Sequence, residues 1–273
     1  MGNRASTASS GFTIIETVLF LAVSGALMAG IIFATSASIG AQRYRDATES
    51  FKALLQEQYA DVVNVQNPRE STLSCNDQAT VTAGSVLAGQ SDCVMVGKYM
   101  IINNTDISTY RVVASKITGV ADDGNDITVL RSAYRLNLDT SSVDEQKLEW
   151  GARIAWARAG DPDDVRTPAT PRSIALLFVR SPASGQTYTF STNTVPNAAQ
   201  LAGATSAQTF LRAMIQSGTA VPGQQGRTIC LDPAAMTAIP SNALYIAPYA
   251  SGASSIEVRS NDVAAGLGVA ERC

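Results

Sequence analysis

The feature that most constrains this chain is a stretch near its N-terminus, from Thr17 to Gln42, in which no side chain is ionisable. As a helix, its 26 residues would extend about 39 Å, enough to cross a bilayer with some tilt. A helix that is apolar on every side belongs in a membrane or in a large core. The stretch therefore indicates a membrane-directed N-terminal segment.

Two ordinary kinds of segment contain such a stretch. A secretory signal has a basic start, an apolar core of roughly 7–15 residues and a cleavage site of small residues. Residues 34–38 offer small residues, but the apolar core is longer here, and Arg4 is the only charged residue before position 12. A plain transmembrane anchor fits the length, although Arg4 on one side and Arg43 and Arg45 on the other do not orient it.

A third kind of segment is indicated by the residues that introduce the stretch. Gly11 is followed by an aromatic residue, Phe12, and then, after three more residues, by Glu16. The segment GFTIIETVLFLAVSGAL resembles the N-terminal signature of type IV pilins and type II secretion pseudopilins, over roughly residues 11–43. The resemblance implies that residues 1–11 are a leader peptide, that a prepilin peptidase cuts between Gly11 and Phe12, and that the new amino group of Phe12 is N-methylated.

A physical argument for Glu16 stands beside the resemblance. A carboxylate at the head of a membrane helix is costly unless a cation pairs with it. Cleavage after Gly11 would create such a cation on Phe12, four residues before Glu16. In a bundle of helices, Glu16 of one subunit is expected to meet the Phe12 amine of its neighbour and so to set the axial stagger. The alternative is a simple helix-start residue at the lipid interface, where the first turn favours a carboxylate.

The helix is predicted to continue beyond the apolar stretch. Residues recur at three- and four-residue steps on one face, with charged residues between them: Tyr44, Ala47, Phe51, Leu54, Leu55, Gln58 and Val62, interleaved with Arg45, Asp46, Glu49, Lys52 and Glu57. Such a stripe suits packing against a globular domain, and Asn67-Pro68 is predicted to end the helix. Residues 12–67 are therefore predicted to form a spine helix, transmembrane in its first half and amphipathic in its second.

Residues 68–273 are predicted to form a β-rich extracytoplasmic head. Short runs with period two predict strands at 94–102, 108–115, 126–131, 133–138, 147–156, 173–180, 186–190, 227–231, 243–247 and 255–259, and a helix at 206–216. Residues 122–125 are interpreted as a hairpin turn and residues 158–172 as an exposed loop. The predicted fold class is α+β, with a long N-terminal helix packed on a C-terminal antiparallel β-sheet head, as in pilins.

Four cysteines, Cys75, Cys93, Cys230 and Cys273, follow the apolar stretch at spacings that match no redox or zinc motif. An even number beyond a membrane segment indicates two disulfides in an oxidising compartment. Of the three possible connectivities, Cys75–Cys93 with Cys230–Cys273 is preferred because it closes the shortest loops. Four buried free thiols in a reduced protein are the alternative.

Composition excludes several kinds of chemistry. The chain has no histidine, which rules out histidine-based triads, imidazole metal ligands and histidine pH switches. Lysine and arginine form no block, and the net charge is −3, so no nucleic-acid footprint is visible. No glycine-rich phosphate cradle follows a strand, and no serine–lysine pair has nucleophile spacing. We predict no enzymatic activity and no cofactor.

Two groups of residues allow a second interpretation. The oxygen-bearing side chains of residues 122–126 are potential calcium ligands, but the twelve-residue calcium loop with its distal glutamate is absent, and a turn explains them better. We therefore predict no metal site.

Trp150 and Trp156 lie six residues apart on a predicted strand and so share a face. They are expected to pack in the core rather than to form a ligand platform.

The sequence therefore predicts a structural subunit of a filament, a minor pilin or pseudopilin because of its large head. Expected partners are a prepilin peptidase, other subunits through the N-terminal helix, and the pilus assembly machinery. The expected location is the cytoplasmic membrane, crossed once, and then an extracellular pilus or pseudopilus. The main rival is a membrane-anchored extracellular adhesin or binding domain that does not polymerise, and an anchored enzyme is a third possibility.

Overall fold

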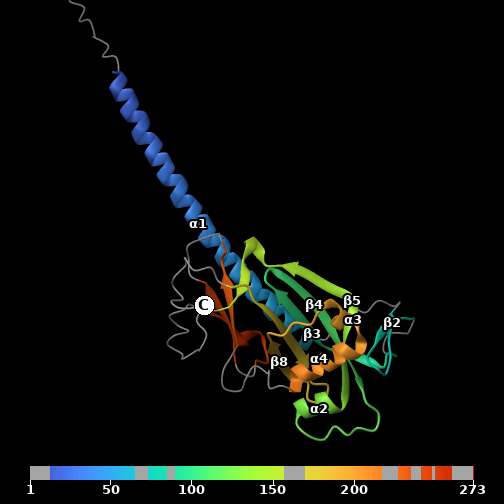
Figure 1. Cartoon of the computed structure of the whole chain (residues 1–273). Coiled ribbons are helices and arrows are strands. Elements are labelled where there is room, and N and C mark those ends of the chain that lie inside the picture. The colour runs from blue at the N-terminus through green and yellow to red at the C-terminus, as the bar shows by residue number, and fades with distance from the viewer. Residues whose placement is uncertain are drawn as a thin grey trace, which may run out of the picture.

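The structure is a computed structural model that describes residues 13–64, 73–84, 90–156, 170–216, 227–234, 241–247, 250–259 and 273. One long helix, α1 (Ile14–Val63), projects from a head of antiparallel sheets and short helices (Figure 1). The helices of the head are α2 (Asp126–Ser132), α3 (Ala198–Ala202) and α4 (Ala204–Gln216). Its strands are β1 (Leu73–Cys75), β2 (Val81–Ala83), β3 (Cys93–Asn103), β4 (Asp106–Lys116), β5 (Tyr134–Lys147), β6 (Arg153–Ala155), β7 (Ser173–Arg180), β8 (Thr187–Thr192), β9 (Arg227–Asp232), β10 (Asn242–Ile246) and β11 (Ile256–Arg259).

The strands form two main sheets and one small pair. The five-stranded sheet has the order β5-β4-β3-β7-β8, the four-stranded sheet has the order β11-β10-β9-β6, and β1 pairs with β2. Neighbouring strands are antiparallel throughout. The predicted α+β class, with a long N-terminal helix on an antiparallel sheet head, is confirmed.

The central strands of the five-stranded sheet are buried on both faces. Met100 and Ile102 of β3 belong to a cluster that also contains α1 and the four-stranded sheet. The alternate residues, Tyr99 and Ile101, belong to a second cluster with α2, α3 and α4. The five-stranded sheet is therefore a middle layer, with α1 and the second sheet on one face and the three short helices on the other.

The second half of α1 forms one wall of the first cluster. Its buried residues follow three- and four-residue steps, as the predicted amphipathic stripe requires: Gly40, Tyr44, Ala47, Thr48, Phe51, Leu55, Gln58, Tyr59 and Val62. Leu54 packs at the edge of the stripe and is only partly buried. The helix ends at Val63 with Asn64 as its C-cap, and Asn67-Pro68, the predicted end, lies outside the described residues.

Tyr44 fastens α1 to the four-stranded sheet from inside the core. Its hydroxyl donates a hydrogen bond to the carbonyl oxygen of Leu231 at 2.6 Å and accepts one from the backbone N–H of Asn242. The side chain is 1% exposed, so water does not compete for these groups. One side chain of α1 thus bridges the neighbouring strands β9 and β10.

Tyr59 makes a second such connection, to the five-stranded sheet. Its hydroxyl lies 2.7 Å from that of Thr189 in β8, and the Thr189 hydroxyl donates to the carbonyl oxygen of Ala250 at 3.0 Å. Because a hydroxyl has one proton to donate, Tyr59 is the donor to Thr189. Burial raises the pKa of Tyr59 to about 12.

Most predicted elements of the head are confirmed. The strands predicted at 94–102, 108–115, 133–138, 173–180, 186–190, 227–231, 243–247 and 255–259 each overlap an observed strand, and the helix predicted at 206–216 lies within α4. The pattern missed the three-residue strands β1 and β2 and the second half of β5. In that half, residues 140–147 are exposed, so no alternation of buried and exposed positions marks the strand.

The strand predicted at 126–131 is wrong, because these residues form helix α2. Residues 122–125 lead into this helix instead of forming a hairpin turn. Asn125 is the N-cap, and its Oδ1 accepts a hydrogen bond from the backbone N–H of Thr128 at 2.9 Å. Leu130 packs in the second core cluster. The β-branched run suggested a strand, but the cap and the buried helix face determine the structure.

The strand predicted at 147–156 is confirmed only in its last part, β6, because a 3-10 turn at Glu149–Gly151 interrupts it. Trp150 and Gly151 both have positive φ angles, of 55° and 74°, which end the strand. The chain then enters β6, which belongs to the four-stranded sheet. The turn thus carries the chain from one sheet to the other.

Both tryptophans lie at the surface and not in the core as predicted. Trp150 is 51% exposed with the guanidinium of Arg43 4.9 Å from its ring centre, and Trp156 is 39% exposed with that of Arg172 at 4.3 Å. The change of sheet means that the two residues no longer share a strand face. Arg172 itself is buried, although the predicted loop 158–172 was expected to be exposed; residues 158–169 of this loop lie outside the described residues.

The four cysteines form the disulfides Cys75–Cys93 and Cys230–Cys273, the pairings that close the shortest loops. The first joins the end of β1 to the start of β3, and the second joins β9 to Cys273. Their Cα atoms are 5.8 and 5.2 Å apart, within the usual range for disulfides.

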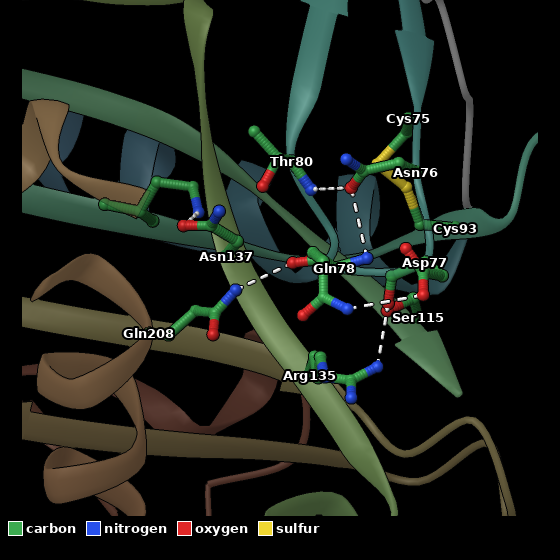
Figure 2. The surroundings of a disulfide bond; sticks show 11 residues. Cys75, Asn76, Asp77, Gln78, Thr80, Cys93, Ser115, Arg135, Asn137 and Gln208 are labelled. Atoms are coloured by element: carbon green, nitrogen blue, oxygen red, sulfur yellow. Dashed lines mark hydrogen bonds between the residues drawn. A yellow bond between two sulfur atoms is a disulfide. The ribbon is translucent and has the colours of Figure 1, made fainter. Parts of the chain in front are cut away.

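The turn between β1 and β2 rests on the five-stranded sheet beside the first disulfide (Figure 2). Within the turn, Oδ1 of Asn76 accepts a hydrogen bond from the backbone N–H of Gln78 at 3.1 Å. The carbonyl oxygen of Asp77 accepts one from the hydroxyl of Ser115 and another, at 3.1 Å, from the guanidinium of Arg135. Side chains of β4 and β5 therefore fix the position of the turn.

We expect Tyr44→Phe to lower the free energy of unfolding by about 1–3 kcal/mol, because the carbonyl of Leu231 and the N–H of Asn242 both lose a partner inside the core. Tyr59→Phe should cost less, about 1 kcal/mol, since Thr189 keeps its bond to Ala250. Urea unfolding of the full-length protein in non-ionic detergent, followed by circular dichroism, compares the two variants. A larger loss for Tyr59→Phe would contradict this account.

We expect Cys230→Ser with Cys273→Ser to lower the free energy of unfolding by about 4 kcal/mol, and Cys75→Ser with Cys93→Ser by about 3 kcal/mol. The estimates follow from loops of 43 and 18 residues, because a longer loop restricts the unfolded chain more. Urea unfolding of the two double variants tests the order. Peptide mapping without reduction tests the pairing, and a peptide that links Cys93 to Cys230 would contradict it.

Candidate assembly site on the N-terminal helix

Helix α1 begins with reciprocal hydrogen bonds between Thr13 and Glu16. The backbone N–H of Glu16 donates to Oγ1 of Thr13 at 3.3 Å, and the backbone N–H of Thr13 donates to Oε2 of Glu16 at 2.9 Å. The hydroxyl of Thr13 also donates to Oε2, at 3.0 Å. This capping box fixes the first turn and holds the carboxylate where the helix dipole favours negative charge.

Of the residues predicted for processing and assembly, the structure places only Glu16. Gly11 and Phe12 lie outside the described residues. Thr13, the partner that holds the Glu16 carboxylate, was missed by the interpretation of the sequence. The signal was present, since threonine followed three residues later by glutamate is the sequence signature of a capping box.

The first half of α1 makes no buried contact with the rest of the described chain. From Ile14 to Ile39 no residue is buried, and large apolar side chains such as Ile14 and Phe33 are 85% and 79% exposed. Burial begins at Gly40, where the helix meets the head. The helix is long and apolar enough to cross a membrane. An apolar surface of this extent needs a cover, because soluble monomers rarely expose so much.

Glu16 is the one ionisable side chain between Thr13 and Gln42. In an apolar environment its carboxylate requires a cation or further donors. Both hydrogen bonds that it accepts from described residues go to Oε2, and Oε1 accepts none from them. The N-terminal end of α1 thus holds a carboxylate in a fixed position, and the helix that follows is apolar.

The 3-10 turn at Glu149–Gly151 supports α1 at the point where it leaves the head. Arg43 stacks on Trp150 with the guanidinium carbon 4.9 Å from the ring centre. About two helical turns further along α1, the hydroxyl of Ser50 donates to Oε2 of Glu149 at 3.0 Å. The surface position of Trp150 therefore has a structural role at this junction.

Two of the acidic residues considered as potential calcium ligands form an ion pair or hydrogen bonds with other side chains. Asp122 forms an ion pair with Lys116. Asp126 accepts hydrogen bonds from the hydroxyls of Ser184 and Tyr188, which lower the pKa of its carboxyl. Among the residues that the structure describes, no group of three histidine, cysteine, aspartate or glutamate side chains is placed to hold a metal ion.

Comparison with known proteins assigns this chain to no family: no family model, curated protein or solved structure matches it.

A chain that begins at Ile39 is expected to stay folded and to be soluble without detergent, because it keeps every buried position of α1. Its free energy of unfolding should equal that of the full-length protein, both measured in the same detergent, within about 0.5 kcal/mol. Sedimentation and urea unfolding provide the two measurements. A shortened chain that aggregates, or that loses its β-sheet circular dichroism, would show that residues before 39 belong to the fold of the head.

Proposed function

We propose that this chain is a structural subunit of a filament of the type IV pilus kind, assembled through α1 after a prepilin peptidase removes residues 1–11. The large head favours a minor pilin or a pseudopilin over the bulk subunit. The observation that supports the proposal most strongly is the asymmetry of α1. One unbroken helix has a second half built into the core of the head and a first half with no buried contact in the described chain.

The uncovered half of α1 fits two environments in succession. Before assembly, lipid of the cytoplasmic membrane covers it, since its length matches the hydrocarbon layer. In a filament, the corresponding halves of neighbouring subunits cover one another, and side chains exposed on every side of the helix suit such a bundle. The head stays outside the membrane, which accords with its two disulfides. The pilus assembly machinery would move the subunit from one environment to the other.

Glu16 supplies the contact that sets the position of each subunit. Cleavage after Gly11 gives Phe12 a positively charged amino group, which keeps its charge when methylated. Within the bundle, the Phe12 amine of one subunit pairs with the Glu16 carboxylate of the next. The capping box favours this contact, because it holds Oε2 with Thr13 and presents Oε1 to the neighbour. An unpaired carboxylate in the same place would cost several kcal/mol, so a wrong axial register is disfavoured.

A membrane-anchored extracellular binding domain that does not polymerise is the second candidate. It is favoured by the same uncovered half of α1, which lipid alone would also satisfy. The two candidates differ over Glu16. An anchor tolerates an uncharged residue there, whereas a filament loses the ion pair between its subunits.

We expect the protein from its native cells to begin at methylated Phe12, and we expect Glu16→Gln to reduce the amount in the sheared filament fraction at least about tenfold. The reason is that breaking a buried ion pair costs about 3–5 kcal/mol. Intact-mass analysis gives the N-terminus, and quantitative immunoblots of the filament and membrane fractions give the distribution. Glu57→Gln is the matched control, because it removes the same charge from an exposed position in the second half of α1.

The outcomes separate the candidates. Processed Glu16→Gln protein that stays in the membrane, with Glu57→Gln in filaments at the wild-type level, supports the filament subunit. Equal surface display and function of wild type and Glu16→Gln, with no filament fraction, would favour the anchored domain. A chain that begins at Met1, or one cut at residues 36–38, would contradict processing after Gly11.

A further inference from the structure

A cavity of about 380 Å³ lies between α2, the start of β5 and α4. Each of these elements contributes one arginine to its lining: Arg131 from α2, Arg135 from β5 and Arg212 from α4. The lining residues belong to the part of the chain that the structure describes, and none of them is an aspartate or a glutamate. Three positive charges therefore meet at one cavity of a protein whose net charge is −3.

The charges of these arginines are not neutralised within the described chain. Neither Arg131 nor Arg212 has an ion pair or hydrogen bond there, and Nε of Arg131 is buried without a partner among the described residues. Arg135 donates to the backbone carbonyl of Asp77 at 3.1 Å, which carries no charge. Like charges that converge on a cavity repel one another, and a buried donor without an acceptor is unfavourable. A bound anion would remove both costs.

Two of the lining residues are held in place from outside the cavity. Gln208 of α4 donates a hydrogen bond to the carbonyl oxygen of Gln78 at 2.7 Å. Arg135 donates one to the carbonyl oxygen of Asp77, the residue before Gln78. Figure 2 shows both side chains reaching the turn that lies beside the Cys75–Cys93 disulfide. The turn thus fixes the separation of α4 and β5 at one rim, so the cavity is a defined feature of the fold.

We propose that this cavity binds a small organic anion of about monosaccharide size through a carboxylate or phosphate group. Guanidinium groups match the paired oxygens of such groups, and each forms two parallel hydrogen bonds with them. The volume lies in the range of small-molecule sites and exceeds what a bare inorganic ion requires. Leu130, Leu136 and Ile215 give the cavity an apolar wall for the body of the ligand, and Thr205 and Thr209 contribute hydroxyls.

The position of the cavity makes the proposal independent of filament assembly. Leu130, Leu136 and Ile215 belong to the second core cluster, on the face of the five-stranded sheet opposite α1. Contacts between subunits through α1 would leave this face open. The head would then present a ligand site at the surface whether the chain polymerises or remains a membrane anchor.

Isothermal titration calorimetry on the full-length protein, in non-ionic detergent at low ionic strength, tests the proposal. The probes are glucuronate, which carries a carboxylate, glucose 6-phosphate, which carries a phosphate, and glucose as the neutral analogue. We expect at least one of the two anions to bind, glucose to bind at least about tenfold more weakly, and added sodium chloride to weaken the anion. The preferred anion identifies the group that the arginines recognise.

Two variants and a matched control locate the site. Arg131→Gln and Arg212→Gln should each weaken the preferred anion at least about tenfold, because a hydrogen-bonded charge is lost. Arg212 is exposed, so its replacement leaves the fold intact. Lys147→Gln removes a cation that is 79% exposed at the other end of β5 and should leave binding unchanged. Urea unfolding checks that each variant is folded.

The proposal is overturned by any of three results. The first is that neither anion binds at millimolar concentration. The second is that glucose binds as tightly as the anions, which would remove the role of the charge. The third is that folded Arg212→Gln binds the preferred anion like wild type, which would place the site elsewhere. Inorganic phosphate is a further probe, and if it binds as tightly as glucose 6-phosphate, the proposal that the ligand is organic is overturned.

Discussion

The burial of the second half of α1 is the interaction on which the rest of the structure depends. Its stripe packs against residues of both the five-stranded and the four-stranded sheet, so the helix and the two sheets share one core. Tyr44 and Tyr59 add directional bonds, one to each sheet, at positions that water does not reach. Packing of apolar area gives most of the stability, whereas the two hydroxyls fix the rotation of the helix and its position along its axis. The direction in which the first half of α1 leaves the head follows from these contacts.

The same helix experiences two environments because its sequence changes character near Gly40. Before this residue the helix is apolar all round and has no buried position, and after it the apolar residues are confined to one face. A helix of this length that was apolar all round would lie wholly in an apolar environment. One that was apolar on a single face would lie along a protein surface over its whole length. In this helix, the C-terminal half is therefore fixed to the head, and the N-terminal half needs a cover of lipid or of other chains. Glu16, held by Thr13 at the far tip, is where an apolar cover has to supply a charge.

Sequence patterns predicted those parts of the fold in which periodicity reflects burial. The stripe from Tyr44 to Val62 and the central strands β3 and β7 were found because core packing selects their apolar residues. The errors occur where local chemistry overrides the pattern. Asn125 is the N-cap of a helix formed by a β-branched run that was predicted as a strand. Trp150 and Gly151 have positive φ angles, and the chain passes to the second sheet at this point. At the candidate assembly site, Glu16 was identifiable from its isolation in an apolar stretch, whereas Gly11 and Phe12 were identified by the sequence motif.

The arginine-lined cavity could not have been found from the sequence, for a physical reason. Arg131, Arg135 and Arg212 form no block in the sequence. They line the same cavity because α2, β5 and α4 pack together in the fold. Charge clusters of this kind arise only when long-range packing places separate elements side by side, so no local pattern encodes them. The middle sheet also separates the two functional surfaces that we propose. One face packs against α1, which carries the proposed membrane and filament contacts, while the other carries the proposed ligand site. A change in the cavity therefore leaves the packing of α1 intact, and the two proposals can be tested in the same molecule without interfering with each other.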